Sequence, residues 1–353
     1  MTMHRLPHPP RVGRLPRPAY RGLLTTGLAT AALLALGLPA ASAEQAKATC
    51  FGRPATITGS GSINGTPGDD VIVGSSGADT VDGGGGNDRI CTRGGDDLVI
   101  GGRGNDKLAA GAGDDQVRGD RFSESGDVVG GGDDLLILGP GDDIASGDSA
   151  ALDGNASGGG RDRIDCGPGD DRVTGDSIAF TGNATGAGDD SIHGGPGLDS
   201  MVGDSNAALD ASGTGGDDLL DFGADGGVFA IGDHASGPGE TATGAGDDRI
   251  IGGTAGELLI GDSASDNVTE AGDDVIRGRG GDNTLFGDNV NFDTDRTVGT
   301  VGGKDLLYGG SGNDTLRAGP SNDRLDGGRN TDLCDGEAGS DIAVRCETVV
   351  GIP

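Results

Sequence analysis

The chain has 353 residues, of which 76 are glycine, none is tryptophan and only two are tyrosine. So little bulky apolar material argues against the core of a conventional globular enzyme. The formal net charge is −32, from 57 acidic and 25 basic residues, which excludes a nucleic-acid-binding protein on electrostatic grounds. An acidic chain with few aromatic residues is also typical of disorder, so we expect it to be expanded unless cations neutralise it.

Residues 1–43 differ from the rest of the chain. They contain five arginines and no acidic residue, followed by the apolar run "GLLTTGLATAALLALGLPA" and the small residues "ASA" at positions 41–43. This pattern predicts a secretory signal peptide, after whose removal no membrane contact is expected. An uncleaved membrane anchor is the alternative, because the run is nearly long enough to span a bilayer. Cleavage would change the net charge from −32 to −37.

A nine-residue repeat follows a predicted N-terminal cap over residues 44–64. Residues 65–118 divide into "GTPGDDVIV", "GSSGADTVD", "GGGGNDRIC", "TRGGDDLVI", "GGRGNDKLA" and "AGAGDDQVR". The glycines permit the positive φ angles of a tight turn, and the last three residues form a short strand whose middle side chain points inward. Two repeats make one coil, and coils stack as parallel strands about 4.8 Å apart. The fold class expected is all-β, a right-handed parallel β-roll or β-helix solenoid. The predicted inward residues are Ile72, Val81, Ile90, Val99, Leu108 and Val117.

Stacking also superimposes the aspartates at the sixth position of the repeat. Two carboxylates about 5 Å apart repel by about 3 to 4 kcal/mol at an effective dielectric constant near 20, so the ladder needs a counter-charge. Carboxylate oxygens beside exposed turn carbonyls form an all-oxygen ligand set, which suits Ca²⁺ better than zinc or copper.

The motif closely resembles the RTX, or hemolysin-type, calcium-binding nonapeptide. The resemblance implies a parallel β-roll with multiple Ca²⁺ ions held between turns of successive coils. Position six would supply carboxylates, and positions one and three would supply backbone carbonyls such as those of Gly83, Gly85, Gly101 and Arg103. The metal ligands predicted in this way are Asp70, Asp79, Asp88, Asp97, Asp106, Asp115, Asp134, Asp143, Asp162, Asp171, Asp190, Asp199, Asp218, Asp248, Asp274, Asp305, Asp314, Asp323, Asp332 and Asp341.

Between residues 119 and 299 the coil lengthens to about 28 residues, as two nonapeptides plus an insertion. The insertions begin with Gly-Asp pairs at intervals of 26 to 29 residues, at Gly119, Gly147, Gly175, Gly203, Gly232, Gly261 and Gly287. If strands alternate between two sides of the coil, all insertions fall on one edge. Segments such as "SAAL" and "SIAF" then either add a third strand and make a three-sided β-helix, which we favour, or protrude as loops.

The Gly-Asp pairs give the long-loop edge a second possible ladder, formed by Asp120, Asp148, Asp176, Asp204, Asp233, Asp262 and Asp288. The opposite edge has Val228, Glu257 and Asn283 at the sixth position, which predicts weaker or absent calcium near residues 223–283. "GDS" recurs once per coil and is replaced in register by "GDH" and "GDN", which argues against Ser149 as a catalytic nucleophile.

The short repeat returns over residues 300–344, and residues 345–353 form a predicted C-terminal cap. Export would permit disulfides among the five cysteines. We predict Cys50–Cys91 and Cys334–Cys346, with Cys166 free or paired between chains. The second bond would fold the tail over the last coil and cover its open strand edge.

Three functions remain open at this point. The first is a secreted calcium-binding protein with a structural or adhesive role, whose cell-surface or matrix partner is unknown. The second is a polysaccharide lyase or epimerase on a β-helix, although no H-E-x-x-H or G-x-S-x-G motif is present. His193 and His234 are expected at outward or loop positions, where a solvated role is more common than catalysis. The third is a calcium buffer or matrix component without a partner.

Overall fold

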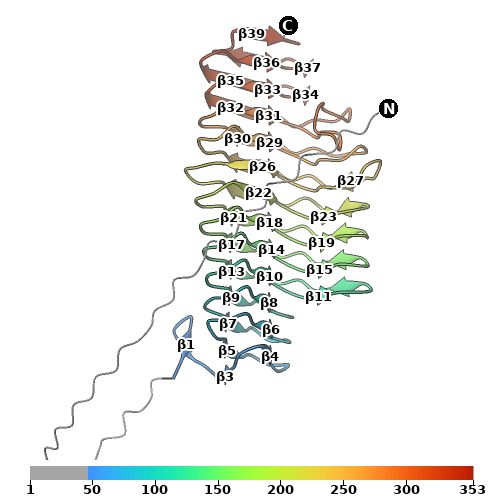
Figure 1. The fold of residues 1–353 in the computed structure, drawn as a ribbon. Coiled ribbons are helices and arrows are strands. Elements are labelled where there is room, and N and C mark those ends of the chain that lie inside the picture. Colours follow the sequence, from blue (N-terminus) through green and yellow to red (C-terminus); the bar gives the residue numbers. More distant parts are fainter. Residues whose placement is uncertain (1–46, 353) are drawn as a thin grey trace, which may run out of the picture. The chain divides into compact units, whose positions relative to one another are not determined.

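The computed structural model describes residues 47–352, which form one solenoid of short strands (Figure 1). Nearly all strand pairs are parallel, and equivalent positions of successive repeats lie opposite one another, as Ile72 does with Ile90 and Ile90 with Leu108. The predicted all-β parallel solenoid is therefore confirmed. The predicted signal peptide lies outside the described residues. Within residues 47–352, no helix is long and apolar enough to cross a membrane.

Two sheets of thirteen parallel strands form the two sides of the roll. Sheet 1 consists of β3 (Ile57–Thr58), β5 (Val71–Val73), β7 (Arg89–Cys91), β9 (Lys107–Ala109), β13 (Leu135–Ile137), β17 (Arg163–Asp165), β21 (Ser191–His193), β25 (Leu219–Asp221), β28 (Arg249–Ile251), β30 (Val275–Arg277), β32 (Leu306–Ser311), β35 (Arg324–Arg329) and β38 (Ile342–Val344).

Sheet 2 lies opposite and receives every second strand of the roll. It consists of β4 (Ser62–Asn64), β6 (Thr80–Asp82), β8 (Leu98–Ile100), β10 (Gln116–Arg118), β14 (Ile144–Ser146), β18 (Arg172–Thr174), β22 (Asp199–Val202), β26 (Gly227–Ile231), β29 (Leu258–Ile260), β31 (Thr284–Phe286), β33 (Thr315–Arg317), β36 (Leu333–Asp335) and β39 (Thr348–Val350). Turns from sheet 1 to sheet 2 form the short-turn edge, and those from sheet 2 to sheet 1 form the long-loop edge.

A single column of apolar side chains fills the space between the two sheets. The six inward residues predicted from the first repeats are all 0% exposed, and the column continues through Leu136, Ile164, Ile192 and Leu220. Each strand contributes only one such side chain because its neighbours point outward or into the turns. The roll is therefore held together by stacking of coils, since one coil buries too little surface to be stable alone.

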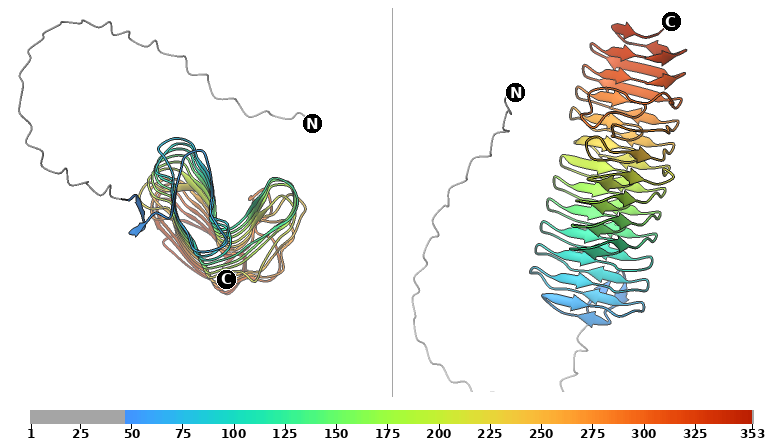
Figure 2. Two further views of the ribbon diagram at one scale, coloured as in Figure 1. Left: turned by 90° about the horizontal axis from the view of Figure 1, so that it is seen from below. Right: turned by 90° about the vertical axis from the view of Figure 1, so that its right-hand side faces the viewer.

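The insertions form a second, smaller lobe beside the roll (Figure 2). This insertion lobe contains one row of strands, β11 (Phe122–Ser123), β15 (Ala150–Ala151), β19 (Ile178–Ala179) and β23 (Asn206–Ala207), and a second row, β12 (Val128–Val129), β16 (Ala156–Ser157), β20 (Ala184–Thr185), β24 (Ala211–Ser212) and β27 (Ala242–Thr243).

Regular ladder bonds hold this lobe together, so the protruding-loop alternative is wrong. The amide of Ala150 donates to the Arg121 carbonyl, and that of Leu152 to the Ser123 carbonyl, both at 2.9 Å. The favoured three-sided helix needs a correction as well. Each insertion runs outward on one strand and returns on another, because it is long enough to turn back and its alanines pack face to face. The cross-section therefore has two lobes.

Disulfides tie down both ends of the described solenoid, as the cysteine spacing predicted. Cys50 bonds to Cys91 and Cys334 to Cys346, and Cys166 is a buried free thiol. At the C-terminal end, β39 pairs with β36 and becomes the last strand of sheet 2, so the tail covers the edge of β36 but leaves that of β39 open. At the other end, β1 (Thr49–Cys50) and β2 (Arg53–Pro54) form an antiparallel pair, while a two-stranded sheet of β34 (Pro320–Ser321) and β37 (Ala338–Gly339) flanks the upper coils.

Candidate metal centre

The sixth-position aspartates form two ladders, one along each edge of the roll. The long-loop edge carries Asp70, Asp88, Asp106, Asp134, Asp162, Asp190, Asp218, Asp248, Asp274, Asp305, Asp323 and Asp341. The short-turn edge carries Asp79, Asp97, Asp115, Asp143, Asp171 and Asp199, and, beyond an interruption, Asp314 and Asp332. All of these side chains are buried.

One hydrogen bond orients each carboxylate. The amide of each aspartate donates to Oδ1 of the equivalent aspartate one coil further on, at 2.6 to 3.0 Å, except at Asp199, Asp332 and Asp341, where a ladder is interrupted or ends. This bond aligns the carboxylates and engages one oxygen of each. The ladders therefore follow directly from the repeat, because Asp at position six ends the turn immediately before the strand.

The second oxygen of nearly every ladder aspartate is buried without a hydrogen-bond partner. The exceptions are Asp70, whose Oδ2 accepts from the Thr66 amide and hydroxyl, and Asp79, whose Oδ2 accepts from the Ser75 amide. Buried carboxylate oxygens without donors are costly unless a positive charge compensates them. The orphaned oxygens therefore fit a cation rather than a further hydrogen bond.

Backbone carbonyls converge on the same places. A Cβ added to Gly83 would lie under 3.0 Å from both Asp88 Oδ2 and the Gly101 carbonyl oxygen of the next coil. The equivalent space beside Gly101 is bounded by Asp106 Oδ2 and the Gly119 carbonyl. Gly83 and Gly101 must therefore be glycine, since a methyl group there would occupy the gap that the oxygens face. Other repeats have a side chain at position one, as Thr92 and Ala110 show. This donor set, one carboxylate and carbonyls, is the hard-oxygen type that Ca²⁺ prefers.

The four carbonyls predicted as ligands are not equivalent. Those of Gly83 and Gly101 face the space beside the position-one glycine of the preceding coil. The Arg103 carbonyl instead accepts the Gly86 amide at 2.8 Å, and Gly85 and Arg103 form an isolated parallel bridge. The position-three carbonyls therefore take part in stacking the turns.

The interrupted part of the short-turn edge supplies a natural comparison. At Asn283 the side-chain amide nitrogen donates to the carbonyls of Gly280 and Gly281, each at 3.3 Å. It lies beside Gly278, in the place that the orphaned oxygen occupies elsewhere. The N–H group of Asn283 thus supplies the positive charge density that a cation would supply between a carboxylate and the turn carbonyls.

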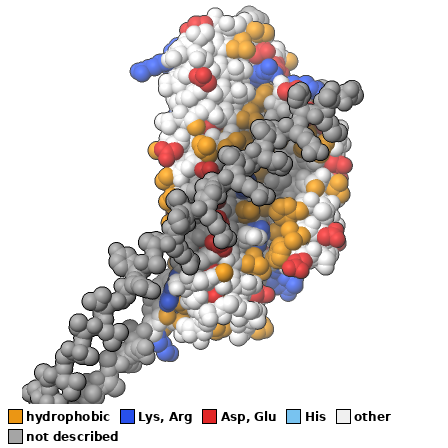
Figure 3. All heavy atoms as spheres, in the orientation of Figure 1, with side chains coloured by type: hydrophobic (Ala, Val, Ile, Leu, Met, Phe, Trp, Pro, Cys, Tyr) orange, Lys and Arg blue, Asp and Glu red, His pale blue; other side chains and the backbone are white. Residues whose placement is uncertain are grey.

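Burial makes the ionised ladders unfavourable without a counter-charge. Burial, with a smaller contribution from neighbouring ladder carboxylates, raises the pKa of Asp106 and Asp115 to about 7 and that of Asp88 to about 6. Figure 3 shows only scattered acidic side chains on the face in view, although the net charge is −32. Much of the negative charge lies inside the solenoid, which is the physical reason for requiring cations.

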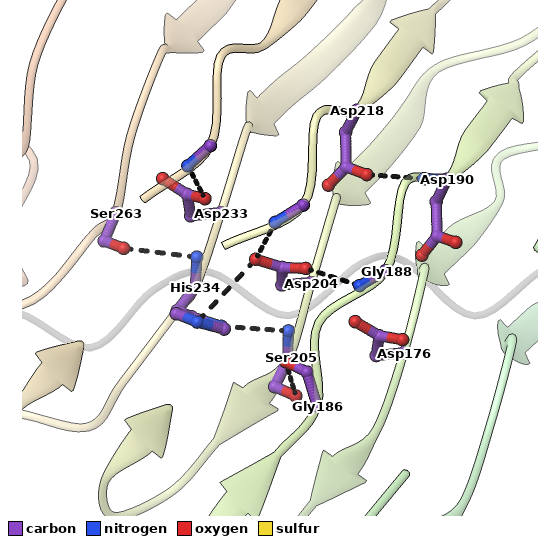
Figure 4. A network of polar contacts seen from close by, with 12 residues as sticks. Asp176, Gly186, Gly188, Asp190, Asp204, Ser205, Asp218, Asp233, His234 and Ser263 are labelled. Atoms are coloured by element: carbon purple, nitrogen blue, oxygen red, sulfur yellow. Dashed lines mark hydrogen bonds and ion pairs between the residues drawn. The ribbon is translucent and has the colours of Figure 1, made fainter. Parts of the chain in front are cut away.

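The Gly-Asp pairs form a third ladder, as the sequence indicated, but its position depends on the tertiary fold. Asp120, Asp148 and Asp176 are 0% exposed and lie beside the long-loop ladder where the insertions leave the roll. Figure 4 shows the adjacent rows a little further along, with Asp176 and Asp204 in one and Asp190 and Asp218 in the other.

One expectation about the histidines is wrong. His193 is exposed as expected, but His234 is 0% exposed. Its Nδ1 accepts from the Ser205 amide at 3.2 Å, and its Nε2 lies 3.7 Å from Asp204 Oδ2. Burial lowers the pKa of His234 to about 4, so it is neutral at pH 7. His234 is enclosed because the insertions stack on one another, which places it between Ser205 and Ser263 of the neighbouring coils.

Fold and donor set together define a calcium-binding parallel β-roll protein. The model of the RTX calcium-binding nonapeptide repeat matches more than half of the chain, over residues 57–90, 64–99, 92–123, 128–150, 156–177, 184–207, 261–291 and 302–343. The chain therefore belongs to the family of RTX calcium-binding repeat proteins. Neither the curated proteins nor the solved structures contained a significant match to it.

Proposed function

We propose that this is an exported protein whose folding is driven by extracellular Ca²⁺ and whose folded solenoid has a structural or adhesive role outside the cell. The observation that carries the proposal is the buried ladder of carboxylates, nearly all with one orphaned oxygen, in a chain of net charge −32. The sixth-position aspartates are the proposed ligands. Residues 1–43 are the proposed signal peptide.

Coupling between binding and folding follows from the location of the ligands. Successive ligands belong to different coils, so a site exists only where coils are stacked. A ligand that binds only the folded state stabilises it by RT ln(1 + [L]/Kd), which is about 1.4 kcal/mol per site at tenfold excess over Kd. Sites of extracellular modules typically have Kd values on the order of 10⁻⁴ to 10⁻³ M, so external calcium suffices to saturate many of them.

Calcium titration by calorimetry, with far-UV circular dichroism recorded in parallel, tests this function. The expected result is a mostly unordered chain in EDTA that gains β signal as several Ca²⁺ ions bind. A spectrum that shows the complete fold in chelator and does not change with Ca²⁺ would contradict the coupling. Cell fractionation tests the export.

We further propose that the solenoid is not itself an enzyme. The two ladders and the core account for the repeated residues, and Ser149 donates to the Gly130 carbonyl at 3.3 Å from a fully buried position, as a structural hydroxyl does. Cleavage or epimerisation of polyuronates by the purified protein in Ca²⁺ would overturn this part of the proposal.

A further inference from the structure

Five carboxylates meet at the junction between the roll and the insertion lobe. Asp120, Asp134 and Asp148 form one group of three, and Asp148, Asp162 and Asp176 form the next. Within each group, one carboxylate oxygen of every member lies within 4.8 Å of the others. Asp148 belongs to both groups, so the five side chains form one continuous column.

The column is closed to solvent and short of donors. Its five aspartates are at most 3% exposed. Both oxygens of Asp120 and the Oδ2 atoms of the other four have no hydrogen-bond partner among the described residues. The remaining oxygen of Asp148 accepts the Gly132 amide at 3.2 Å, which fixes the orientation of the carboxylate. Buried anionic oxygens this close together, without donors, need a positive charge between them.

Higher in the same ladder, the protein supplies the missing donors itself. Asp262 occupies the position equivalent to Asp148 and is also 0% exposed. Its Oδ1 accepts the Gly272 amide at 2.8 Å, and its Oδ2 accepts the Asn289 side-chain amide at 3.1 Å. That same nitrogen of Asn289 also donates to the Glu270 carbonyl at 2.7 Å.

Asp204 is a second aspartate of this ladder whose two oxygens both have donors. Its carboxylate accepts the amides of Gly188 and Gly216 at 3.4 and 3.2 Å, with His234 beside it (Figure 4). Donors therefore reach both oxygens of Asp204 and of Asp262, whereas Asp233 Oδ2 and Asp288 Oδ2 of the same ladder have no partner among the described residues. No donor reaches the Oδ2 atoms of the column from Asp120 to Asp176 within the described residues.

The charge of the column matches a divalent ion. Each coil contributes two carboxylates here, one from the Gly-Asp pair and one from the sixth position, whereas the short-turn edge has one per coil. One divalent cation per coil neutralises the two carboxylates of that coil. A donor set made only of carboxylate oxygens suits Ca²⁺ better than zinc or copper.

The geometry points to an interior site for two Ca²⁺ ions, one held by Asp120, Asp134 and Asp148 and the other by Asp148, Asp162 and Asp176. This inference rests on the proposed calcium function and deepens it, because the nonapeptide pattern assigns no ligand to the Gly-Asp pairs. Three carboxylates per ion and complete burial give these two sites tighter binding and slower release than turn sites with one carboxylate.

Asp148→Asn tests the shared ligand. The variant keeps Oδ1 for the Gly132 amide and replaces only the orphaned oxygen with a neutral group. In full-length protein, calcium calorimetry is expected to show Kd values raised on the order of tenfold or more for two ions. Release into a fluorescent chelator should lose its slowest phase. In EDTA, the same variant should be more resistant to urea than wild type, because it removes a buried charge; a purely structural role predicts the opposite.

Two further variants distinguish a failure of the interior site from a failure of the proposed calcium function. Asp262→Asn changes an equally buried aspartate of the same ladder whose oxygens already have donors, so ion count and slow phase should stay as in wild type. Asp88→Asn removes an ordinary turn ligand and should cost one ion without affecting the slow phase. The interior site is refuted if Asp148→Asn binds and releases calcium like wild type while Asp88→Asn loses an ion. Wild type that binds no calcium would refute the proposed function as well.

Discussion

The main-chain amide of Asp88 donates to Oδ1 of Asp106, one coil further along, at 2.7 Å. The same bond links every neighbouring pair along the long-loop edge and holds the register, and the second oxygen of Asp106, Asp134 and Asp162 faces the glycine that follows the preceding strand. The register of the coils and the arrangement of the negative charges therefore depend on each other. Correct stacking of coils is what concentrates the negative charge, and cations are what make that stacking favourable.

The position-one glycines are expected to be intolerant of alanine. In Gly101→Ala the new Cβ would lie under 3.0 Å from Asp106 Oδ2 and the Gly119 carbonyl, so it would displace both the ligands and any ion between them. We expect loss of one Ca²⁺ in calorimetry and a lower urea midpoint in Ca²⁺. Gly68→Ala is the matched control, since a Cβ there meets nothing within 4 Å. If Gly101→Ala and Gly68→Ala bound the same number of Ca²⁺ ions and had the same urea midpoint, the ion position inferred beside Gly101 would be wrong.

The metal-free fold should become more stable as the pH falls. Burial raises the pKa of Asp106, Asp171 and Asp323 from 3.8 to about 7, so between these pH values the folded state binds more protons than the unfolded chain. Stability in EDTA is therefore greatest below the unfolded pKa and is lost as the pH rises through about 7. Circular dichroism in EDTA should gain β signal from about pH 8 to about pH 5.

Calcium should reverse this dependence, because protons and Ca²⁺ compete for the same oxygens. In excess Ca²⁺, acidification over the same range should weaken binding in calorimetry. β signal that decreases on acidification in EDTA would show that the ladder charges do not oppose folding.

An additional calcium site can be introduced on the interrupted short-turn edge. Asn283→Asp replaces the amide that donates to Gly280 and Gly281 with an anionic oxygen facing those carbonyls. We expect one more Ca²⁺ in calorimetry and a lower urea midpoint in EDTA. Asn313→Asp adds the same charge at a neighbouring exposed position and serves as the control. An unchanged ion count in Asn283→Asp would mean that the carbonyls there do not face a cation position.

The C-terminal disulfide is expected to hold the final coil in place. Cys334 is buried in the core, and its bond to Cys346 spans 12 residues of sequence, so Cys346→Ala should cost about 3 kcal/mol by the chain-entropy model. Hydrogen exchange should increase in β39 and β36 first, because β39 is the last strand of sheet 2. Cys166→Ala, which removes a free thiol, should leave the exchange of β39 unchanged. Wild-type exchange of β39 in Cys346→Ala would show that the strand is held by its ladder bonds alone.

The ladders and the core were predictable because each repeat is nearly self-contained. The position of Asp88 relative to Asp106, and of Ile90 relative to Leu108, depends only on a nine-residue unit repeated twice per coil. The disulfides were predictable for the same reason, since Cys50 and Cys334 lie at opposite ends of a regular stack. The two-lobed cross-section was not, because no local pattern says whether an insertion adds one strand or runs out and back.

The sequence by itself therefore determined the parallel solenoid, its inward residues, its two ladders of aspartates and its membership of the RTX repeat family. Only the tertiary structure decided that Asp148, a member of the predicted Gly-Asp ladder, lies within reach of Asp134 and Asp162. It also decided that His234 is buried against Asp204 rather than solvated. Both findings have the same physical reason: these distances depend on how each insertion runs out from the roll and returns to it, and the repeat pattern does not encode that path.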